Sequence, residues 1–304
     1  MTRRRRYCFG LLLAAAVATP AVACAQEMEP RAFSPSPVGV DFLFVGYARS
    51  TGGVLTDPSL PVDDVEATVN AGVLGYGRTF SLFGHLANAG LVVPRVSGHF
   101  TGTLDGEDAE ASRSGFGDLK LRLATNLIGA PALSPAEFAA RKPTTTLGVS
   151  LTVSAPTGEY HPDKLINVGT NRWAVKPEIG LSHPIGKWYL EAMAGVWFFD
   201  DNHDFFGGQL REQDPLKSVQ AHVSYTFRPK LWLAFNATFY DGGRTTVNGA
   251  RKDDRQSNSR YGLTFSTPIS RSQSLKLYWN DGATTRIGSD FTTYGITWQY
   301  THQR

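Results

Sequence analysis

The 304-residue chain is poor in cysteine and in charge, and it has no long apolar run beyond its N-terminal leader. Its two cysteines are Cys8 and Cys24, so a chain without that leader can form no disulfide framework and no thiolate metal site. Charged residues make up 19% of the chain, against roughly 25% in typical soluble domains. The lack of a second apolar stretch of about 20 residues excludes a bundle of transmembrane helices.

An excess of positive charge is also missing. Lys and Arg number 30, but four of them, Arg3 to Arg6, belong to the leader, which leaves 26 basic against 27 acidic residues. A nucleic-acid-binding protein needs a basic surface, so this class of function is excluded. Intrinsic disorder is excluded as well, because 41% of the residues are hydrophobic.

Residues 1–25 have the organisation of a secretory signal peptide. Arg3 to Arg6 give a positive start, residues 8–18 are apolar, and small residues follow at Ala21, Ala23 and Ala25. This pattern predicts export and cleavage after Ala23 or Ala25. Cleavage after Ala23 would make Cys24 the first residue, in a context similar to a bacterial lipobox, and lipidation of Cys24 stays an alternative.

From residue 38 onward, apolar and polar side chains alternate in segments of about ten residues. In residues 147–154, for example, Leu, Val, Leu and Val alternate with Gly, Ser, Thr and Ser. A period of two with one apolar face is typical of half-exposed strands, and about 9–11 tilted residues cross a bilayer. The sequence predicts about twelve strands, near residues 38–50, 64–77, 84–97, 116–127, 144–155, 172–183, 187–199, 216–228, 230–241, 258–269, 273–282 and 290–301. The first and third of these alternate poorly.

The connections between the predicted strands differ in length in a regular way. Those after even-numbered strands are short, whereas those after odd-numbered strands are mostly long and cover residues 51–63, 99–115, 156–171, 200–215, 241–257 and 283–289. Outer-membrane barrels have short periplasmic turns, long outer loops and an even number of strands. Lipid offers no hydrogen-bond partner to a strand edge, so the sheet must close on itself. We therefore expect an all-β domain at 38–304, a closed antiparallel transmembrane β-barrel, after a Pro/Ser-rich segment at 26–37.

One connection breaks this rule. Residues 126–143 follow an even-numbered strand but form a long segment. The segment contains Ser134-Pro135-Ala136-Glu137, with Ser at the N-cap and Pro at the first helical position. It predicts one short helix at the periplasmic rim.

The six tryptophans fall near the ends of predicted strands. Indole side chains favour the headgroup level of a bilayer, so the candidates for two aromatic girdles are Trp173, Trp188, Trp279 and Trp298. Trp197 and Trp232 lie in the more polar register of their strands and fit the lumen. The general preference of aromatic residues for strands explains the same positions without a membrane.

Ionisable residues occur on the polar faces of the predicted strands. A basic side chain that faces lipid at mid-depth costs about 2–4 kcal/mol, so these residues are expected to point into the barrel. The lumen-lining candidates are Lys120, Arg122, Lys176, Glu178, Glu191, His222, Arg260 and Lys276. They either line a wet passage or pair and block it, because about twelve strands enclose far less space than the strands of water-filled porins. Aromatic residues that fit either an apolar lumen wall or the lipid face are Phe42, Phe44, Tyr189 and Tyr240.

Several longer motifs lie between residues 115 and 300. They are N-L-I-G-A-P-A-L at 126–133, P-D-K-L-I-N-V-G-T-N-R-W at 162–173, K-P-E-I-G at 176–180, Y-T-F-R-P at 225–229 and D-D-R-Q-S-N-S-R at 253–260. With these motifs the chain resembles the outer-membrane β-barrel family named for the phenol meta-cleavage (MetA) degradation pathway. The resemblance implies an exported barrel of the bacterial outer membrane, often described as a transporter, with no agreed site residues. Many such barrels end in Phe or Trp, and here Tyr300 is expected to take that place.

The predicted function is an outer-membrane channel for small solutes, including the aromatic or hydrophobic compounds to which the resemblance points. Its expected partners are outer-membrane lipid and lipopolysaccharide, the small-molecule solute, and the barrel-assembly machinery, which would bind the last strand. The sequence contains no nucleophile motif such as G-x-S-x-G, so we expect no enzyme activity. We also expect no cofactor and no metal.

Two other functions are compatible with the same sequence. A barrel-embedded lipid-modifying enzyme would need a Ser/His pair on a strand, and the nearest candidates are His222 and Ser224. A structural or adhesive barrel would have a sealed lumen and loops that bind envelope partners. A soluble periplasmic sandwich is a further alternative.

The outer loops contain three weaker candidates, none with a regular motif. The acidic loop 200–204 has oxygen ligands suited to Ca²⁺, and the basic loop 244–255 has groups suited to lipopolysaccharide phosphate. A catalytic trio would consist of His161, Asp163 and Lys164. Solvated loops with mixed charge explain all three equally well.

Overall fold

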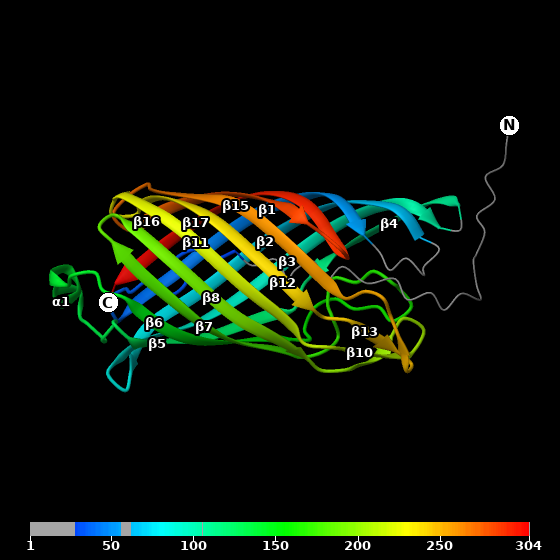
Figure 1. The fold of residues 1–304 in the computed structure, drawn as a ribbon, viewed down its shortest axis with the longest axis horizontal. Coiled ribbons are helices and arrows are strands. Elements are labelled where there is room, and N and C mark those ends of the chain that lie inside the picture. The colour runs from blue at the N-terminus through cyan, green and yellow to red at the C-terminus, as the bar shows by residue number, and fades with distance from the viewer. Residues whose placement is uncertain (1–27, 56–61, 105, 304) are drawn as a thin grey trace.

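The computed structural model describes residues 28–55, 62–104 and 106–303. Within these residues, twelve antiparallel strands form one closed barrel, which confirms the predicted fold (Figure 1). The barrel strands are β1 (Val40–Leu55), β2 (Val62–Leu82), β3 (His85–Leu104), β5 (Leu119–Ile128), β6 (Thr146–Ala155), β7 (Ala174–Ile185), β8 (Trp188–Phe199), β11 (Leu216–Arg228), β12 (Leu231–Gly242), β15 (Gln256–Pro268), β16 (Gln273–Thr284) and β17 (Gly288–Gln303). Each pairs with the next along the chain, and β17 pairs with β1, which closes the sheet.

The barrel has an apolar outside and a mostly polar inside. On β11, Val219 and Val223 are about half exposed, whereas Gln220 and His222 are buried. The same alternation continues on neighbouring strands, where the outward side chains include Leu151, Leu181, Leu190, Phe235 and Leu263. Large apolar side chains outside and polar ones inside are typical of a barrel in lipid and the reverse of a soluble protein. The alternative prediction of a soluble periplasmic sandwich is therefore wrong.

The two ends of the barrel differ. Short turns connect β2 to β3, β7 to β8, β11 to β12 and β15 to β16, and they lie at the end that carries the helix and the C-terminus (Figure 1). Longer connections lie at the opposite end. Since outer-membrane barrels have short periplasmic turns, we call the first the periplasmic end and the second the outer end.

The short helix lies at the periplasmic end, as the sequence predicts. α1 (Pro135–Ala140) starts after Ser134, whose hydroxyl accepts a hydrogen bond from the Glu137 N–H, while the Glu137 carboxylate accepts one from the Ser134 N–H at 2.8 Å. This capping box satisfies amide groups that a helix start leaves unpaired. Among the described residues, no helix has the length and apolar character needed to cross a membrane.

Three of the expected outer loops contain strands, so these predictions are wrong in part. Residues 99–115 extend β3 beyond the barrel and turn back as β4 (Glu107–Phe116). Residues 200–215 and 241–257 supply a second sheet, which in the described chain consists of β9 (Asn202–Phe205), β10 (Gln209–Gln213), β13 (Thr245–Val247) and β14 (Ala250–Arg251). Strands beyond the lipid are held by backbone pairing and need no apolar face. Their sequences therefore lack the alternation that marks a barrel strand.

Candidate functional site

The inner wall of the barrel has two chemically different sectors. From β6 to β15 it presents buried polar side chains such as Ser150, Thr152, Gln220, Asn236 and Thr264, which we call the polar sector. From β1 to β3 it presents small or apolar side chains, which we call the apolar sector: Ala48, Val69, Ala71, Val73, Val92 and Val96.

Strand register assembles the apolar sector. Ala48 of β1, Ala71 of β2 and Val96 of β3 stand in one row across the three strands. Val73 and Pro94 stand opposite each other two residues further along. Residues between these rows point to the outside of the wall, because neighbours on a strand point to opposite faces. The sector is therefore a continuous apolar strip along the inside of the barrel.

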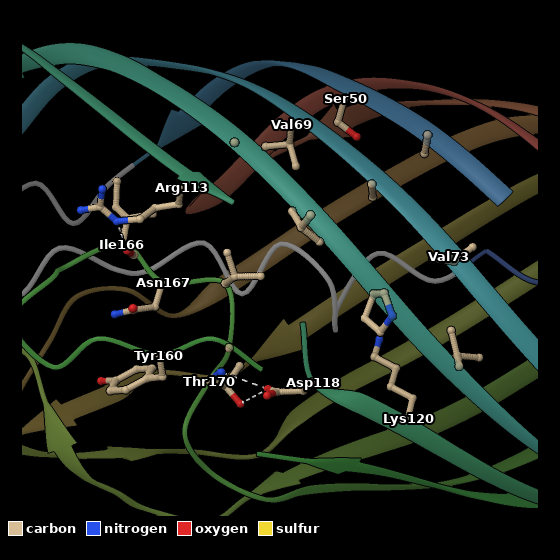
Figure 2. Close-up of a pocket in the computed structure, with 18 of the residues that line it drawn as sticks. Ser50, Val69, Val73, Arg113, Asp118, Lys120, Tyr160, Ile166, Asn167 and Thr170 are labelled. Carbon is tan, nitrogen blue, oxygen red and sulfur yellow. Dashed lines mark hydrogen bonds between the residues drawn. The ribbon is translucent and has the colours of Figure 1, made fainter. Parts of the chain in front are cut away.

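A cavity of about 290 Å³, here called the outer cavity, lies between the apolar sector and the outer loops. Val69 and Val73 of β2 line one side, and the loop 156–173 faces them through Asn167 and Thr170 (Figure 2). Among the described residues, four basic and one acidic side chain also line this cavity: Arg113, Lys120, Arg172, Arg211 and Asp118. The cavity thus has an apolar side and a charged side.

Asp118 holds the loop 156–173 against the outer cavity. Its Oδ1 accepts a hydrogen bond from the Gly158 N–H at 2.9 Å, and its Oδ2 accepts two from Thr170, at 2.9 Å from the N–H and 2.6 Å from the hydroxyl (Figure 2). Near its two ends the loop is in contact with itself, since a Cβ on Gly158 or on Gly169 would lie 2.7 Å from the other residue's backbone. Glycine at both positions permits this close approach. The loop is therefore a fixed partition beside the cavity.

The small outer sheet supports the same loop. Asn202 of β9 donates hydrogen bonds from Nδ2 to the Tyr160 hydroxyl at 2.9 Å and to the Thr170 carbonyl at 3.3 Å. Burial raises the pKa of the Tyr160 hydroxyl, which keeps the phenol protonated. Arg211 of β10 lies 5.1 Å from the ring centroid of Phe205, and burial lowers the pKa of its guanidinium. All five side chains belong to the wall that closes the outer cavity.

A smaller cavity of about 70 Å³, here called the inner cavity, follows toward the periplasmic end. Val92 and Lys120 line both cavities, so the two are adjacent at these side chains. Lys176 and Glu178 form a buried ion pair in the wall of the inner cavity, with Nζ and Oε2 3.1 Å apart. Glu29, from the N-terminal segment, lines the same cavity.

Residues 28–37, here called the plug, lie inside the periplasmic half of the barrel. The Arg31 N–H donates to the Glu191 carboxylate at 2.9 Å, and the Arg31 guanidinium donates to the hydroxyls of Ser224 and Thr226. Two ring centroids lie 4.7 Å from the same guanidinium, those of Tyr189 and Trp232. Arg31 thus ties the plug to β8, β11 and β12.

Phe33 of the plug fills a gap that two glycines of the wall leave open. A Cβ on Gly180 would lie 2.2 Å from the Phe33 ring, and a Cβ on Gly148 would lie 2.4 Å from it. The Arg122 guanidinium lies 5.2 Å from the centroid of this ring, which is 4% exposed. Side chains, rather than strand pairing, therefore hold the plug in place.

The predicted lumen-lining residues lie on strand faces that point into the barrel, but they do not form one cluster. Those of the inner cavity are Lys120, Arg122, Lys176 and Glu178. Glu191 binds the plug, and Arg260 donates to the Asn280 side-chain oxygen at 2.8 Å. Lys276 stands opposite the buried Ser266 in the register of β15 and β16. A role in solute passage stays a prediction for all of them.

The tryptophans divide between the two faces of the barrel wall. Trp173 and Trp188 are 51% and 49% exposed, while Trp279 and Trp298 are partly exposed and share the outward faces of β16 and β17. Trp197 is 1% exposed and lies inside, as does Trp232. The aromatic candidates Phe42, Phe44, Tyr189 and Tyr240 lie on inward faces as well. A girdle role for the four outward tryptophans stays a prediction.

The structure shows shaping residues that the sequence analysis did not single out: Arg31, Phe33, Asp118, Tyr160 and Arg211. All of them except Asp118, which lies near the start of the predicted strand 116–127, lie outside the predicted strands. In such segments the folding of the chain back toward the lumen decides which groups meet. One signal in the sequence could have pointed to the outer loop, because the motif at 162–173 is part of the loop that Asp118 holds.

His222 and Ser224 do not form a nucleophile and base at the lipid surface. Both are buried inside the barrel, at 1% and 0% exposure. His222 Nδ1 lies 2.8 Å from Asn236 Oδ1, and the Ser224 hydroxyl accepts hydrogen bonds from Arg31. The prediction that this pair is the site of a lipid-modifying enzyme at the lipid-facing wall is therefore wrong.

Charges in the outer loops pair locally. Arg251 binds Asp214 at 2.8 Å and Arg255 binds Asp241 at 2.7 Å, which weakens the basic field expected for lipopolysaccharide. Lys164 pairs in the same way with Asp163, at 2.9 Å. Within the described parts of the chain, no group of three or more His, Cys, Asp or Glu side chains could hold a metal ion.

A closed barrel with an apolar exterior, a polar interior and cavities along its lumen defines a transmembrane β-barrel of the outer-membrane class. The sequence model of the family described as "Putative MetA-pathway of phenol degradation" matches residues 49–296, and the chain belongs to this family. No curated protein matches the sequence significantly.

Solved structures share the fold. The chain is similar to the COG4313 outer membrane channel from Pseudomonas putida F1, with 22% identity and a TM-score of 0.77, over 91% of this chain and 100% of that one. It is also similar to the β domain of the Bordetella autotransporter BrkA, with 12% identity and a TM-score of 0.51, over 86% of this chain and 99% of that one. At these identities the similarity shows a common barrel architecture.

Proposed function

We propose that the protein is an outer-membrane channel for small solutes that carry an apolar part, aromatic compounds included. The observation that carries this function is the adjacency of the outer and inner cavities, which meet at Val92 and Lys120 along the apolar sector. The name of the P. putida protein, an outer membrane channel, and the phenol pathway in the family name support the proposal.

Passage through this channel requires the plug to move. Burying Phe33 contributes about 1.5–3 kcal/mol, and each hydrogen bond of Arg31 contributes on the order of 1 kcal/mol. Together these contacts contribute about 5–7 kcal/mol, which keeps the plug in place most of the time and permits rare openings. The plug is therefore a gate whose position a solute or a thermal fluctuation can change.

Export fits the same function. We propose that residues 1–25 are removed, so that a mature chain cleaved after Ala25 starts two residues before Met28. The mature N-terminus would then belong to the plug itself, and changes at the signal-peptidase site would alter the gate. Mass spectrometry of the protein isolated from outer membranes identifies the first residue.

Planar-bilayer recording of the refolded mature chain tests the channel. We expect discrete, short openings in KCl, because the plug closes the lumen most of the time. A flat trace from protein whose folding is confirmed by heat-modifiable gel migration, and also from a variant without the plug residues 28–33, would contradict a channel. Buffer with detergent alone is the control for leakage.

A further inference from the structure

The outward face of the wall changes from apolar to polar toward the outer end of β17, β1, β2 and β3, which pair side by side (Figure 1). One row across these strands consists of Trp298, Val45, Leu74 and Val93. A row nearer the outer end consists of Thr292, Thr51, Thr68 and His99. Such a change marks the level at which the hydrocarbon core of the bilayer ends.

Two exposed arginines point outward between these rows. Arg49 of β1 stands opposite Asn70 of β2, and Arg95 of β3 stands opposite Gly72, one row closer to the apolar side. Among the described residues, neither guanidinium forms a hydrogen bond or an ion pair, and that of Arg95 lies 5.3 Å from the ring centroid of Phe116. A ring face positions a cation without cancelling its charge. Both charges therefore face the surroundings of the barrel.

Aromatic side chains border the two arginines. Tyr47 occupies the outward position before Arg49 on β1, and Tyr294 stands opposite Arg49 on β17. Tyrosine favours the interface between hydrocarbon and head groups, so these rings mark the same level of the bilayer. Gly72 of β2 stands between Tyr47 and Arg95 and has no side chain that would cover either. The guanidinium groups therefore lie uncovered at the level of the head groups.

The physical cost of an outward arginine agrees with this position. The cost is largest at the middle of the bilayer and falls toward zero at its interfaces, where the methylene groups lie on apolar surface and the guanidinium reaches the head groups. A guanidinium binds a phosphate through two parallel, charge-assisted hydrogen bonds. Only β2 separates β1 from β3, so their backbones are about 10 Å apart, and two long side chains can reach one head group.

Carboxylates of the outward face do not oppose these two charges. On the same strands they come nearer the outer end, at Glu66 and Glu110. The residues opposite the two arginines in the register carry no charge. On another part of the wall, Lys217 of β11 also points outward, but Asp241 of β12, which Arg255 binds as well, stands opposite it. Lys217 thus faces a carboxylate, whereas the arginines on β1 and β3 face none.

We propose that the outward face of β1, β2 and β3 binds lipopolysaccharide. Arg49 and Arg95 bind the phosphates of its lipid A part, and the acyl chains lie on the apolar rows below them. The outer end of the barrel lies in the leaflet that this lipid forms. The basic loop 244–255 is a poorer site, because Arg251 and Arg255 are paired with carboxylates. The inference does not depend on the channel, since a barrel with a sealed lumen has the same outward face.

Native mass spectrometry of the refolded mature chain in detergent measures the binding of three lipids: lipid A, lipid A without its phosphates, and phosphatidylglycerol. We expect lipid A to bind about tenfold tighter than its dephosphorylated form, since charge-assisted hydrogen bonds are worth that factor. We expect it also to bind tighter than phosphatidylglycerol, which offers one negative charge to two arginines. Equal binding of lipid A with and without phosphates would overturn the proposal. Equal binding of phosphatidylglycerol would overturn lipopolysaccharide as the occupant.

Variants of the outward face locate the site. Arg49→Gln and Arg95→Gln are each expected to lower the affinity for lipid A about threefold, and the double variant is expected to bind lipid A no tighter than its dephosphorylated form. Lys217→Gln is the matched control, because it removes an outward charge that faces Asp241. The arginines lie on different strands, so a folding defect in one single variant leaves the other to decide. An equal loss from Lys217→Gln would overturn the assignment to β1 and β3.

Chelation separates the arginines from the carboxylates as the binding groups. A carboxylate such as that of Glu66 binds a phosphate only through a bridging divalent cation, for which its oxygens are suitable ligands. Arginine binds the phosphate directly, so we expect the affinity for lipid A to be unchanged in EDTA. Loss of binding in EDTA would assign the contact to bridged carboxylates and overturn the role of the arginines. None of these measurements uses conductance, so a failure of the channel proposal would leave this inference standing.

Discussion

The polar and apolar sectors of the lumen wall are built from the same kind of strand, yet the chain uses them differently. The polar sector and the strands beside it hold the plug, through contacts of Arg31 and Phe33 with β6, β7, β8, β11 and β12. The apolar sector borders the outer cavity and reaches the inner one through Val92. Hydroxyls and carboxylates of the polar sector bind the plug, a segment of the protein's own chain, whereas the methyl groups of the apolar sector leave a surface open to a solute. In the proposed channel, the polar sector would therefore close the lumen and the apolar sector would carry the path of the solute.

Loss of the plug's anchors is expected to have the largest effect. The double variant Arg31→Ala/Phe33→Ala loses the side-chain hydrogen bonds to Ser224 and Thr226 and the burial of the ring. We expect a several-fold increase in the fraction of time that the channel is open, measured in planar bilayers. An unchanged open fraction would show that the polar sector does not hold the gate.

A change in the wall tests the same anchor without altering the plug. Gly180→Ala places a methyl group where the Phe33 ring lies, so it is expected to displace the plug and raise the open fraction as the double variant does. Gly72→Ala is the control, since a Cβ there would lie 3.9 Å from the Arg95 carbonyl oxygen, an ordinary van der Waals distance. An equal response of the two glycine variants would contradict the fit between Phe33 and the wall.

The Asp118 contacts are expected to have the next largest effect. Asp118→Ala removes the acceptor of three hydrogen bonds and releases the loop 156–173, which widens the outer cavity and raises the conductance of each opening. Asp163→Ala is the control, because Asp163 pairs with Lys164 at the exposed side of the same loop. A rise in open fraction without a rise in single-opening conductance would argue against a partition role for the loop.

The strands of the polar sector were easier to predict from the sequence than those of the apolar sector. Strands such as β6 and β11 alternate clearly because their inner faces are polar and their outer faces apolar, so their positions were predictable. The predicted first and third strands alternate poorly because β1 and β3 have apolar or small residues on both faces, for example Leu91 and Val92. Poor alternation was therefore a sign of the apolar sector, which the period alone could not reveal.

The plug and the outer loop were not predictable from the same rules. Arg31 and Phe33 meet partners more than a hundred residues away, and no local pattern encodes such a pairing. The helix at Ser134 was predictable because its two start signals, Ser at the N-cap and Pro at the first helical position, are neighbours in the sequence. Sequence analysis thus found the strands and the helix, which local patterns determine. It missed the contacts of the plug, which depend on how the chain folds back into the lumen.

The buried ion pair Lys176–Glu178 of the lumen wall allows a test by measurement of the protein's stability. Glu178→Gln leaves a buried lysine without its carboxylate, a change that costs about 3–5 kcal/mol in a dry interior and less beside a wet cavity. We expect a lower urea midpoint for unfolding, which heat-modifiable gel migration measures. The double variant Lys176→Gln/Glu178→Gln is expected to recover most of the stability, because the positive charge is removed together with the carboxylate that balances it. A double variant less stable than the single one would contradict this account.

The smallest effect is expected from Val92, where the apolar sector meets both cavities. Val92→Thr keeps the shape of the side chain and replaces one methyl group by a hydroxyl, so neither the plug nor the loop loses a contact that holds it. Conductance in KCl is expected to stay the same, while block of the current by an aromatic solute weakens by about a factor of two to four, the worth of roughly one methyl group against apolar surface. Thr152→Val makes the opposite change on the polar side of the inner cavity and is expected to leave aromatic block unchanged. If Thr152→Val alters the block as much as Val92→Thr does, solutes contact both sectors equally. Such a result would contradict the division of the lumen into a polar sector that holds the plug and an apolar sector that solutes contact.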